Sequence, residues 1–411
     1  MDSNLSMLKY YKRHIFTLKD MLDEIDPSSN DFTPLLEAQK YILDRILDTE
    51  LRISKKKAEL RELKKSLRAN RNGKERSIEI KSKISNVNES LAGYKFLLYV
   101  WRCFGDGIVF KYISKWNLKR LLFEVDSPKI KQKSGFIGGK EGIEEEWKVV
   151  MSAVDHNVPA VLCDITNSIR HGDVCLLGAS DPHVIEVKSS QNSNKRVKRQ
   201  IESIEKIHCY FENDLGSIGG LDGMRRVAFP DDEKHHNAEI NDVIRTLVNE
   251  KSCKICPEPG LHYMGIQTGT VTDYDNLFDG IKEPLVYMLN QAKTDGRWDN
   301  YYPFTLSIRD AESLYRFLTG EVYLFVVIDG SILKAMFKDI GFDLDIVMSE
   351  DAGFVFSKVV DGYEEPFVYI ASEHYVGRLG LEFISLKWFL EKEEFMLKEM
   401  EDELLGQLQN A

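Results

Sequence analysis

Two heptad repeats separated by one short turn constrain the fold of this chain more than any other sequence feature. In each repeat, apolar positions alternate in steps of four and three residues, which is the spacing of a coiled-coil seam. The residues Asn70-Arg71-Asn72-Gly73 between the repeats favour a turn. The sequence therefore predicts an antiparallel coiled-coil hairpin over residues 34–100. Its seam positions are Ile42, Ile46, Thr49, Ile53, Lys56, Leu60, Leu63 and Leu67, followed by Ile80, Ile84, Val87, Leu91, Tyr94 and Leu98.

The middle of this hairpin is strongly basic in an acidic chain. Residues 52–83 hold thirteen Lys or Arg and four Asp or Glu, a local charge of +9, so the total of −11 leaves −20 for the remainder. A basic hairpin tip is suited to nucleic acid, although two packed helices with a solvated charged face explain the same pattern. Exposed seams also pair readily, so we expect a homo-oligomer or a protein partner.

Length and composition limit the class of protein. A chain of 411 residues, 43% hydrophobic and 29% charged, has enough apolar surface for two or three globular domains. The apolar runs at 96–101 and 323–328 are far shorter than the ~20 residues of a membrane span. We expect no membrane partner, a cytoplasmic location and six cysteines that remain thiols.

The fold expected overall is α/β, with four segments along the chain. Residues 1–33 contain an amphipathic helix, at about 4–25, and residues 34–100 are the hairpin. Residues 101–215 carry the candidate chemistry. Residues 216–411 are expected to form an α/β or α+β domain with a regulatory or sensing role, because strand-like runs at 322–328 and 366–371 alternate with predicted helices at 307–318 and 385–408.

The most informative motif is a predicted β-hairpin whose polar residues lie on one edge. Strands at 174–177 and 183–187 flank a Gly-Ala-Ser-Asp-Pro turn. Asp173 opens the first strand, and Glu186 and Lys188 share one face of the second. Carboxylate oxygens suit Mg²⁺ or Mn²⁺, which can polarise a phosphodiester. Lys188 is placed to orient a water molecule or to stabilise transition-state charge.

Helices are predicted on both sides of this hairpin. In the upstream helix, residues 142–153, Glu144 and Glu146 border the buried face; we favour Glu144 and keep Glu146 as the alternative. The glycine-rich loop before it, residues 134–142, lacks the Walker A spacing and is expected to be flexible. The downstream helix, residues 194–211, exposes a basic face that suits a phosphate backbone: Lys195, Arg196, Lys198 and Arg199.

This ordered set resembles the PD-(D/E)xK nuclease superfamily over about residues 138–212. The resemblance implies a restriction-endonuclease-like core, in which a mixed sheet is flanked by helices. It implies catalytic roles for Glu144, Asp173, Glu186, Lys188 and Gln200, with Asp173, Glu186 and Glu144 as metal ligands. Ile204 stands where some subfamilies have Tyr, so the chain departs from their Gln-x-x-x-Tyr pattern at that position. The implied function is a Mg²⁺-dependent endonuclease, a hydrolase acting on DNA, similar to those of prokaryotic restriction or anti-phage (antiviral) defence.

Other functional classes remain open at this point. One alternative is an inactive nuclease-fold module that binds nucleic acid or a partner protein, and another is a coiled-coil scaffold. Three further groups of residues have two interpretations each, a functional and a structural one. They are Cys253 and Cys256 as zinc ligands or a turn, His235, His236 and Glu239 as metal ligands or a solvated loop, and Trp298 with Arg297, Tyr301 and Tyr302 as a base-stacking loop or a hydrophobic closure. Cys163 and Cys175 are expected to be buried core residues.

Overall fold

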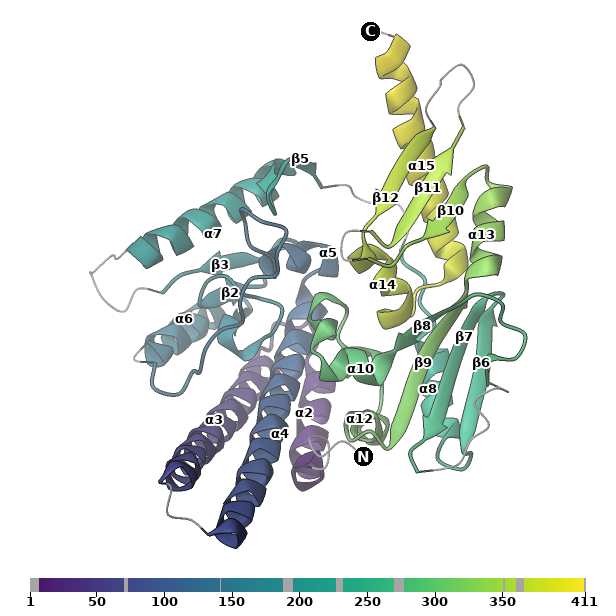
Figure 1. Ribbon diagram of the computed structural model, residues 1–411. Helices are drawn as coiled ribbons and strands as arrows, with labels where there is room; N and C mark the ends of the chain where they lie inside the picture. The colour runs from purple at the N-terminus through teal and green to yellow at the C-terminus, as the bar shows by residue number, and fades with distance from the viewer. Residues whose placement is uncertain are drawn as a thin grey trace. The chain divides into compact units, whose positions relative to one another are not determined.

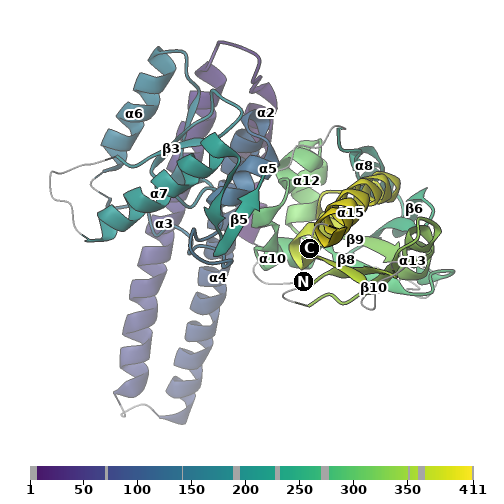
Figure 2. The ribbon, with the colours of Figure 1, turned by 90° about the horizontal axis from the view of Figure 1, so that it is seen from above.

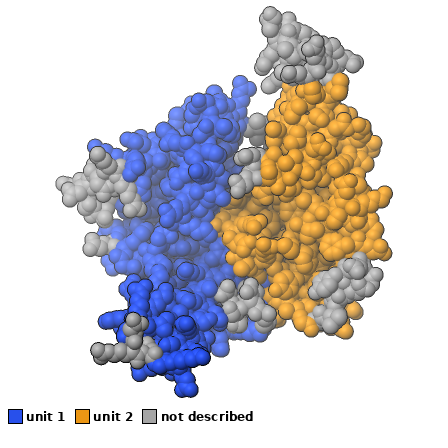
Figure 3. All heavy atoms as spheres, viewed as in Figure 1, with its two compact units in different colours: residues 1–228, 302–306, 310–319 blue, residues 229–301, 307–309, 320–411 orange. Residues whose placement is uncertain are grey.

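The computed structural model describes residues 7–69, 73–140, 142–187, 195–226, 232–269, 277–349, 352–359 and 366–409, without the side chains of 195–197 and 402–409. The chain divides into two compact units (Figure 3). Unit 1 comprises residues 1–228, 302–306 and 310–319, and unit 2 comprises residues 229–301, 307–309 and 320–411. Along the chain, the first passage from unit 1 to unit 2 falls at residue 228, and the helical hairpin belongs to the same unit as the candidate site.

The predicted helical hairpin is present as two long antiparallel helices (Figures 1 and 2). They are α3 (Thr33–Arg68) and α4 (Lys74–Tyr112). Seam residues Ile42, Ile46 and Ile53 are buried, and Val87 and Leu91 are buried on the opposite helix. Helix α4 continues past residue 100 because nearly every side chain from Val100 to Val109 is buried. The root of the hairpin is thus part of a core, whereas the tip is mostly exposed.

Short helices cover this root. The expected N-terminal helix is present as η1 (Met7–Tyr11) and α2 (Lys12–Glu24), with Ile15, Leu18 and Leu22 buried. Helix α12 (Ala311–Leu318) packs on α2, where Lys12 Nζ lies 2.9 Å from Glu312 Oε2. Asp310 caps α12 through the Ser313 amide, so the helix begins later than the predicted residue 307, and the preceding short helix α11 is separate (Phe304–Ser307).

The candidate site lies in a small sheet with the order β1-β2-β3. Its strands are β1 (Ala160–Leu162), β2 (Val174–Leu176) and β3 (His183–Ile185), so the predicted β-hairpin is confirmed. Helix α6 (Ile143–Asp155) contacts β1 and β2, and α7 (Lys195–Asn213) contacts β3 (Figure 1). The short α5 (Lys115–Leu118), η2 (Lys119–Leu121) and η3 (Cys163–Ile165) complete this region.

The expected mixed sheet does not form among the described strands. All three strands are antiparallel, and the strand after α7, β4 (Leu215–Ile218), pairs instead with β5 (Leu221–Arg225). Gly219 and Gly220 connect them with positive φ angles of 68° and 75°, which suits a tight hairpin turn. The tight turn makes the nearest strand in sequence the partner of β4.

Unit 2 is an α+β body with two antiparallel sheets, in the orders β6-β7-β9-β8 and β10-β11-β12. The strands and terminal helix expected at 322–328, 366–371 and 385–408 are present. No helix in the described ranges is long and apolar enough to cross a bilayer. The elements are α8 (Asn237–Thr246), β6 (Ser252–Glu258), β7 (Leu261–Gln267), β8 (Pro284–Met288), α10 (Leu289–Thr294), η4 (Arg297–Asn300), β9 (Val322–Asp329), α13 (Gly330–Asp339), β10 (Asp343–Ile346), β11 (Phe354–Lys358), β12 (Phe367–Ala371), α14 (Glu373–Leu381) and α15 (Leu386–Gln409).

Candidate active site

Asp173 directly precedes the central strand β2 and is fixed by backbone hydrogen bonds on both sides. Its amide donates to Ile185 O at 2.8 Å, and its carbonyl accepts from the Cys163 amide at 2.9 Å. The carboxylate Oδ2 accepts a hydrogen bond from the Val187 amide at 2.9 Å. Gly172 precedes it with φ of 69°, and a Cβ there would lie 3.0 Å from Ile185 O, so glycine is needed for this approach.

The second predicted carboxylate, Glu186, directly follows β3 and is half-buried. Its charge acts on the Glu146 carboxyl, which places the two residues in one electrostatic cluster. Lys188 lies outside the described residues, so the predicted Glu-x-Lys element is placed only at Glu186.

The helical glutamate in this cluster is Glu146, not the favoured Glu144. Glu144 is exposed, whereas Glu146 is only 5% exposed and lies one turn before the buried Val150. The predicted buried face was centred on Trp147 and Met151, but Met151 is 36% exposed. The true face is rotated toward Glu146 because the helix packs through Val150.

Two residues of the cluster were missed by sequence reasoning. Asp164 follows β1 in η3 and is buried, and its carboxylate forms an ion pair with Lys140 from the glycine-rich loop. An acidic residue directly after the apolar run 160–163 is the feature that could have indicated Asp164. The sequence pattern predicts no functional role for Lys140, because the glycine-rich loop that carries it does not match a nucleotide-binding pattern.

The carboxylates oppose one another's ionisation. Burial, together with Asp173, Asp164 and Glu186, raises the pKa of Glu146 to about 7, against the opposing effect of Lys140. Burial also raises the pKa of Asp173, although the Val187 amide and Lys140 act in the other direction. Burial lowers the pKa of Lys140, but attraction to Asp164 outweighs it, so that pKa is raised. Lys140 is therefore held as a cation by its ion pair with Asp164, and Glu146 and Asp173 add to that attraction.

The glycine-rich loop is held in place by the root of the helical hairpin, contrary to the expected flexibility. Glu50 of α3 accepts hydrogen bonds from the Ile137 amide at 3.0 Å and the Gly138 amide at 2.7 Å. Arg102 of α4 lies 3.9 Å from Glu50 and donates to Asp164 O at 3.0 Å. Glu50 thus holds the loop that carries Lys140, and Arg102 holds the main chain of Asp164.

The same root also completes the edge of the sheet. The Gln39 side chain of α3 donates to Ala160 O at 2.9 Å and accepts from the Leu162 amide at 3.1 Å. Asp106 of α4 accepts from the amides of Asn167 and Ser168, each at 2.8 Å. The helical hairpin therefore takes the place of a neighbouring strand beside β1.

The predicted basic helix is present as α7, but its residues are only partly placed. Lys198 and Arg199 are exposed, as expected for a phosphate-binding face. The side chains of Lys195 and Arg196 lie outside the described part of the chain. Gln200 lies on the same helix and is partly exposed.

The carboxylate oxygens of the cluster are the type of ligand that a hard divalent cation prefers. Glu146 Oε2 is buried and has no hydrogen-bond partner among the described residues. Repulsion among neighbouring carboxylates is the condition that a bound cation relieves. In this arrangement the described residues do not bring three or more His, Cys, Asp or Glu side chains to metal-binding spacing. The ligands of an ion would have to move closer together.

The remaining sequence candidates have structural roles in the described residues. His236 lies 2.7 Å from Glu258 and 3.3 Å from Glu239, and His235 contacts Glu382 O at 2.8 Å. Trp298 is only 3% exposed, so its ring offers no surface for base stacking. Cys163 and Cys175 are buried as expected, and Cys253 and Cys256 are free thiols on β6.

Comparison with known proteins adds no relative: no family model, no curated protein and no solved structure matches this chain.

Proposed function

We propose that this protein is a metal-dependent nuclease that hydrolyses phosphodiester bonds of DNA, with a role in restriction or anti-phage defence suggested by the family resemblance. The observation that carries the proposal is that Asp173, Asp164 and Glu186 all act on the buried Glu146 carboxyl, while Lys140 forms an ion pair with Asp164. The order helix, three antiparallel strands, helix gives it further support. Glu146 Oε2 is buried without a hydrogen-bond partner among the described residues, whereas a purely structural carboxylate would be expected to have one.

The chemistry of the cluster suits hydrolysis at neutral pH. Asp173, Glu186 and Glu146 are the side chains that would hold Mg²⁺ or Mn²⁺, with Asp164 beside them; the bound ion would polarise the phosphodiester and acidify a water molecule. Without the ion, Glu146 has a pKa of about 7, so binding of the ion near neutral pH would displace a proton from this carboxyl. Lys140 would stabilise negative charge on the transferring phosphoryl group, a role first predicted for Lys188.

The test is cleavage of plasmid DNA, linear DNA and RNA with Mg²⁺, Mn²⁺ or EDTA. We expect DNA cleavage that requires the metal, and loss of at least about 100-fold in rate for Asp173→Asn and Glu186→Gln. Cleavage that continues in EDTA, or that persists in both variants, would refute the proposal.

Matched substitutions show which of the two glutamates of the helix, and which of the two lysines, cleavage requires. Glu146→Gln should lose activity, whereas Glu144→Gln on the exposed side of the same helix should retain it. Comparing Lys140→Met with Lys188→Met identifies the lysine that acts. DNA binding without cleavage under every metal condition would favour the alternative of an inactive binding module.

A further inference from the structure

The β-hairpin that presents Asp173 and Glu186 is held at its opposite end by one arginine. Asp173 directly precedes β2 and Glu186 directly follows β3, whereas Asp181 lies in the connection between the two strands. Arg226, which directly follows β5, donates from Nη1 to Asp181 Oδ1 and from Nη2 to Asp181 Oδ2 at 3.1 Å. Two parallel bonds of this kind fix the orientation of the connection as well as its distance from the arginine.

The guanidinium of Arg226 is itself fixed at the end of α7. Its Nη2 donates to Phe211 O at 3.1 Å, and its central carbon lies 5.4 Å from the centre of the Phe211 ring. Its Nε donates to Asp214 Oδ1 at 2.6 Å, and its main-chain amide donates to Asp214 O at 2.9 Å. Asp214 has a φ of 55°, a left-handed conformation that Asp adopts more readily than most residues. Arg226 therefore joins the end of α7 to the connection of the β-hairpin.

A second side chain holds the same connection, residues 177–182. Asn117 of α5 donates from Nδ2 to Ser180 O at 2.9 Å, and its Oδ1 accepts from Arg226 Nη1 at 3.4 Å. The side chains of Arg226 and Asp181 are only 25% and 30% exposed, so water screens their ion pair less than it screens a fully exposed pair. We call Arg226, Asp181 and Asn117 the hairpin clamp.

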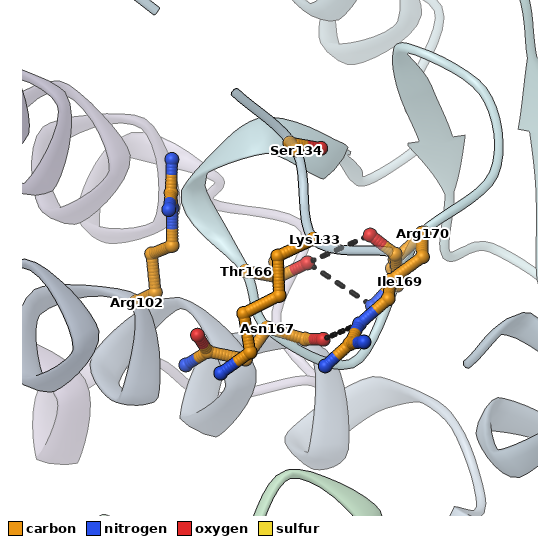
Figure 4. A pocket seen from close by; sticks show the side chains of 7 residues that line it. All are labelled: Arg102, Lys133, Ser134, Thr166, Asn167, Ile169 and Arg170. Carbon is orange, nitrogen blue, oxygen red and sulfur yellow. Dashed lines mark hydrogen bonds between the residues drawn. The ribbon is translucent and has the colours of Figure 1, made fainter. Parts of the chain in front are cut away.

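The segment before β2 is held by bonds of its own. The Ile169 amide donates to Thr166 Oγ1 at 3.2 Å (Figure 4). Arg170 Nε donates to Asn167 O at 3.0 Å in the same view. This segment leads directly to Asp173, which precedes the central strand of the sheet. The position of Asp173 is therefore fixed without the hairpin clamp.

Glu186 depends more strongly on the hairpin clamp. It follows β3, the outer strand of the order β1-β2-β3, which is only three residues long and pairs with β2. Such a short pair of strands is weakly held by its own hydrogen bonds. The other neighbour of β3 is α7, whose end the clamp also holds. Three strand residues span about 10 Å, so a displacement of the connection is carried along β3 to Glu186.

We propose that Arg226 is a positioning residue for the metal ligands. By holding the connection of the β-hairpin against the end of α7, it sets the position of Glu186 relative to Asp173. The inference rests on the proposed function for the identity of these ligands. A guanidinium has no lone pair to offer a cation, so Arg226 acts only through Asp181.

The experiment measures Mn²⁺ binding to the full chain by calorimetry. Asp181→Asn keeps the size of the side chain but replaces one acceptor oxygen of the paired bonds, so it should weaken Mn²⁺ binding about tenfold. Arg226→Gln should weaken it at least as much. Asp214→Asn is the matched control, because it removes the other ion pair of the same arginine and Asn also tolerates the left-handed φ. It should bind Mn²⁺ as wild type.

Hydrogen exchange provides a readout that needs neither metal nor cleavage. The Val187 amide donates to Asp173 Oδ2 at 2.9 Å, so its exchange reports whether the two ends of the β-hairpin stay together. Exchange at Val187 should accelerate in Asp181→Asn and Arg226→Gln and stay at the wild-type rate in Asp214→Asn.

Wild-type Mn²⁺ affinity and wild-type exchange at Val187 in Asp181→Asn would overturn the positioning role, even if the protein cleaves DNA. Equal losses in Asp181→Asn and Asp214→Asn would also overturn it, because they would reduce Arg226 to a general structural contact. Accelerated exchange in Asp181→Asn alone, in a protein that binds no Mn²⁺ in any form, would instead refute the metal-dependent nuclease and support the hairpin clamp.

Discussion

At the scale of single residues, the fold raises the pKa of the Glu146 carboxyl into the physiological range. Its pKa of about 7 lies above the ordinary value of 4.5, so the folded state keeps a proton that the unfolded chain releases. The contribution of Glu146 to the free energy of unfolding should therefore fall as pH rises from about 4.5 to 7 and stay constant above pH 7. We expect Glu146→Gln to be more stable than wild type at pH 8, by up to about 3 kcal/mol, and equal near pH 4. Urea unfolding at the two pH values measures this difference.

The control for this prediction is Glu144→Gln, because Glu144 lies on the same helix but is exposed. It should match wild type at both pH values. At limiting metal concentration, metal binding and therefore cleavage should rise with pH up to about 7, because Glu146 must lose its proton to bind the ion. A Glu146→Gln variant that is less stable than wild type at pH 8 would show that the carboxylate is not destabilised in the folded state.

At the scale of elements, the hairpin root acts as a support for the glycine-rich loop. Glu50 is buried and accepts two loop amides, so Glu50→Gln replaces one acceptor oxygen with a donor and leaves Arg102 without its carboxylate. We expect a loss of about 2–4 kcal/mol in stability, because a buried charge-assisted contact is broken. Hydrogen exchange at the amides of Ile137 and Gly138 should accelerate locally, and cleavage should fall although Glu50 is not in the carboxylate cluster.

Glu59→Gln is the matched substitution on α3, since Glu59 is exposed and pairs only with Lys56 among its described contacts. It should leave exchange and cleavage unchanged. Unaltered exchange at Ile137 and Gly138 in Glu50→Gln would remove the positioning role.

At the scale of the whole molecule, the exposed hairpin tip can be separated from its buried root. Replacing residues 61–81 by a Gly-Ser linker removes eight Lys or Arg and three Asp or Glu while retaining Glu50, Trp101 and Arg102. We expect the shortened chain to fold, to bind nucleic acid with a smaller salt slope, and to lose any self-association through the tip. Light scattering and binding titrations measure both properties.

A full-length variant with Lys64, Lys65 and Arg68 changed to Gln separates the effect of the tip's charge on nucleic-acid binding from the effect of the tip on self-association. It should weaken binding and leave the mass unchanged. Equal mass and equal affinity in the wild-type and shortened chains would show that the tip serves neither purpose.

The sequence by itself determined the elements whose pattern is local. Seam spacing of three and four residues specified α3 and α4, and alternation in 174–187 specified the hairpin that presents Asp173 and Glu186. These patterns succeed because helix and strand periods depend on near neighbours in the chain.

Only the tertiary structure decided the rest of the site. The rotation of α6 about its own axis places Glu146, and not Glu144, on the buried face. The sequence alone does not fix this rotation, because the large apolar residues of the helix are compatible with two neighbouring positions of the buried face. Lys140 and Asp164 meet across 24 residues, Gln39 reaches Ala160 across 121, and Thr305 donates to Cys103 O across 202. Contacts at such separations depend on how whole elements pack, and that packing leaves no periodic trace in the sequence.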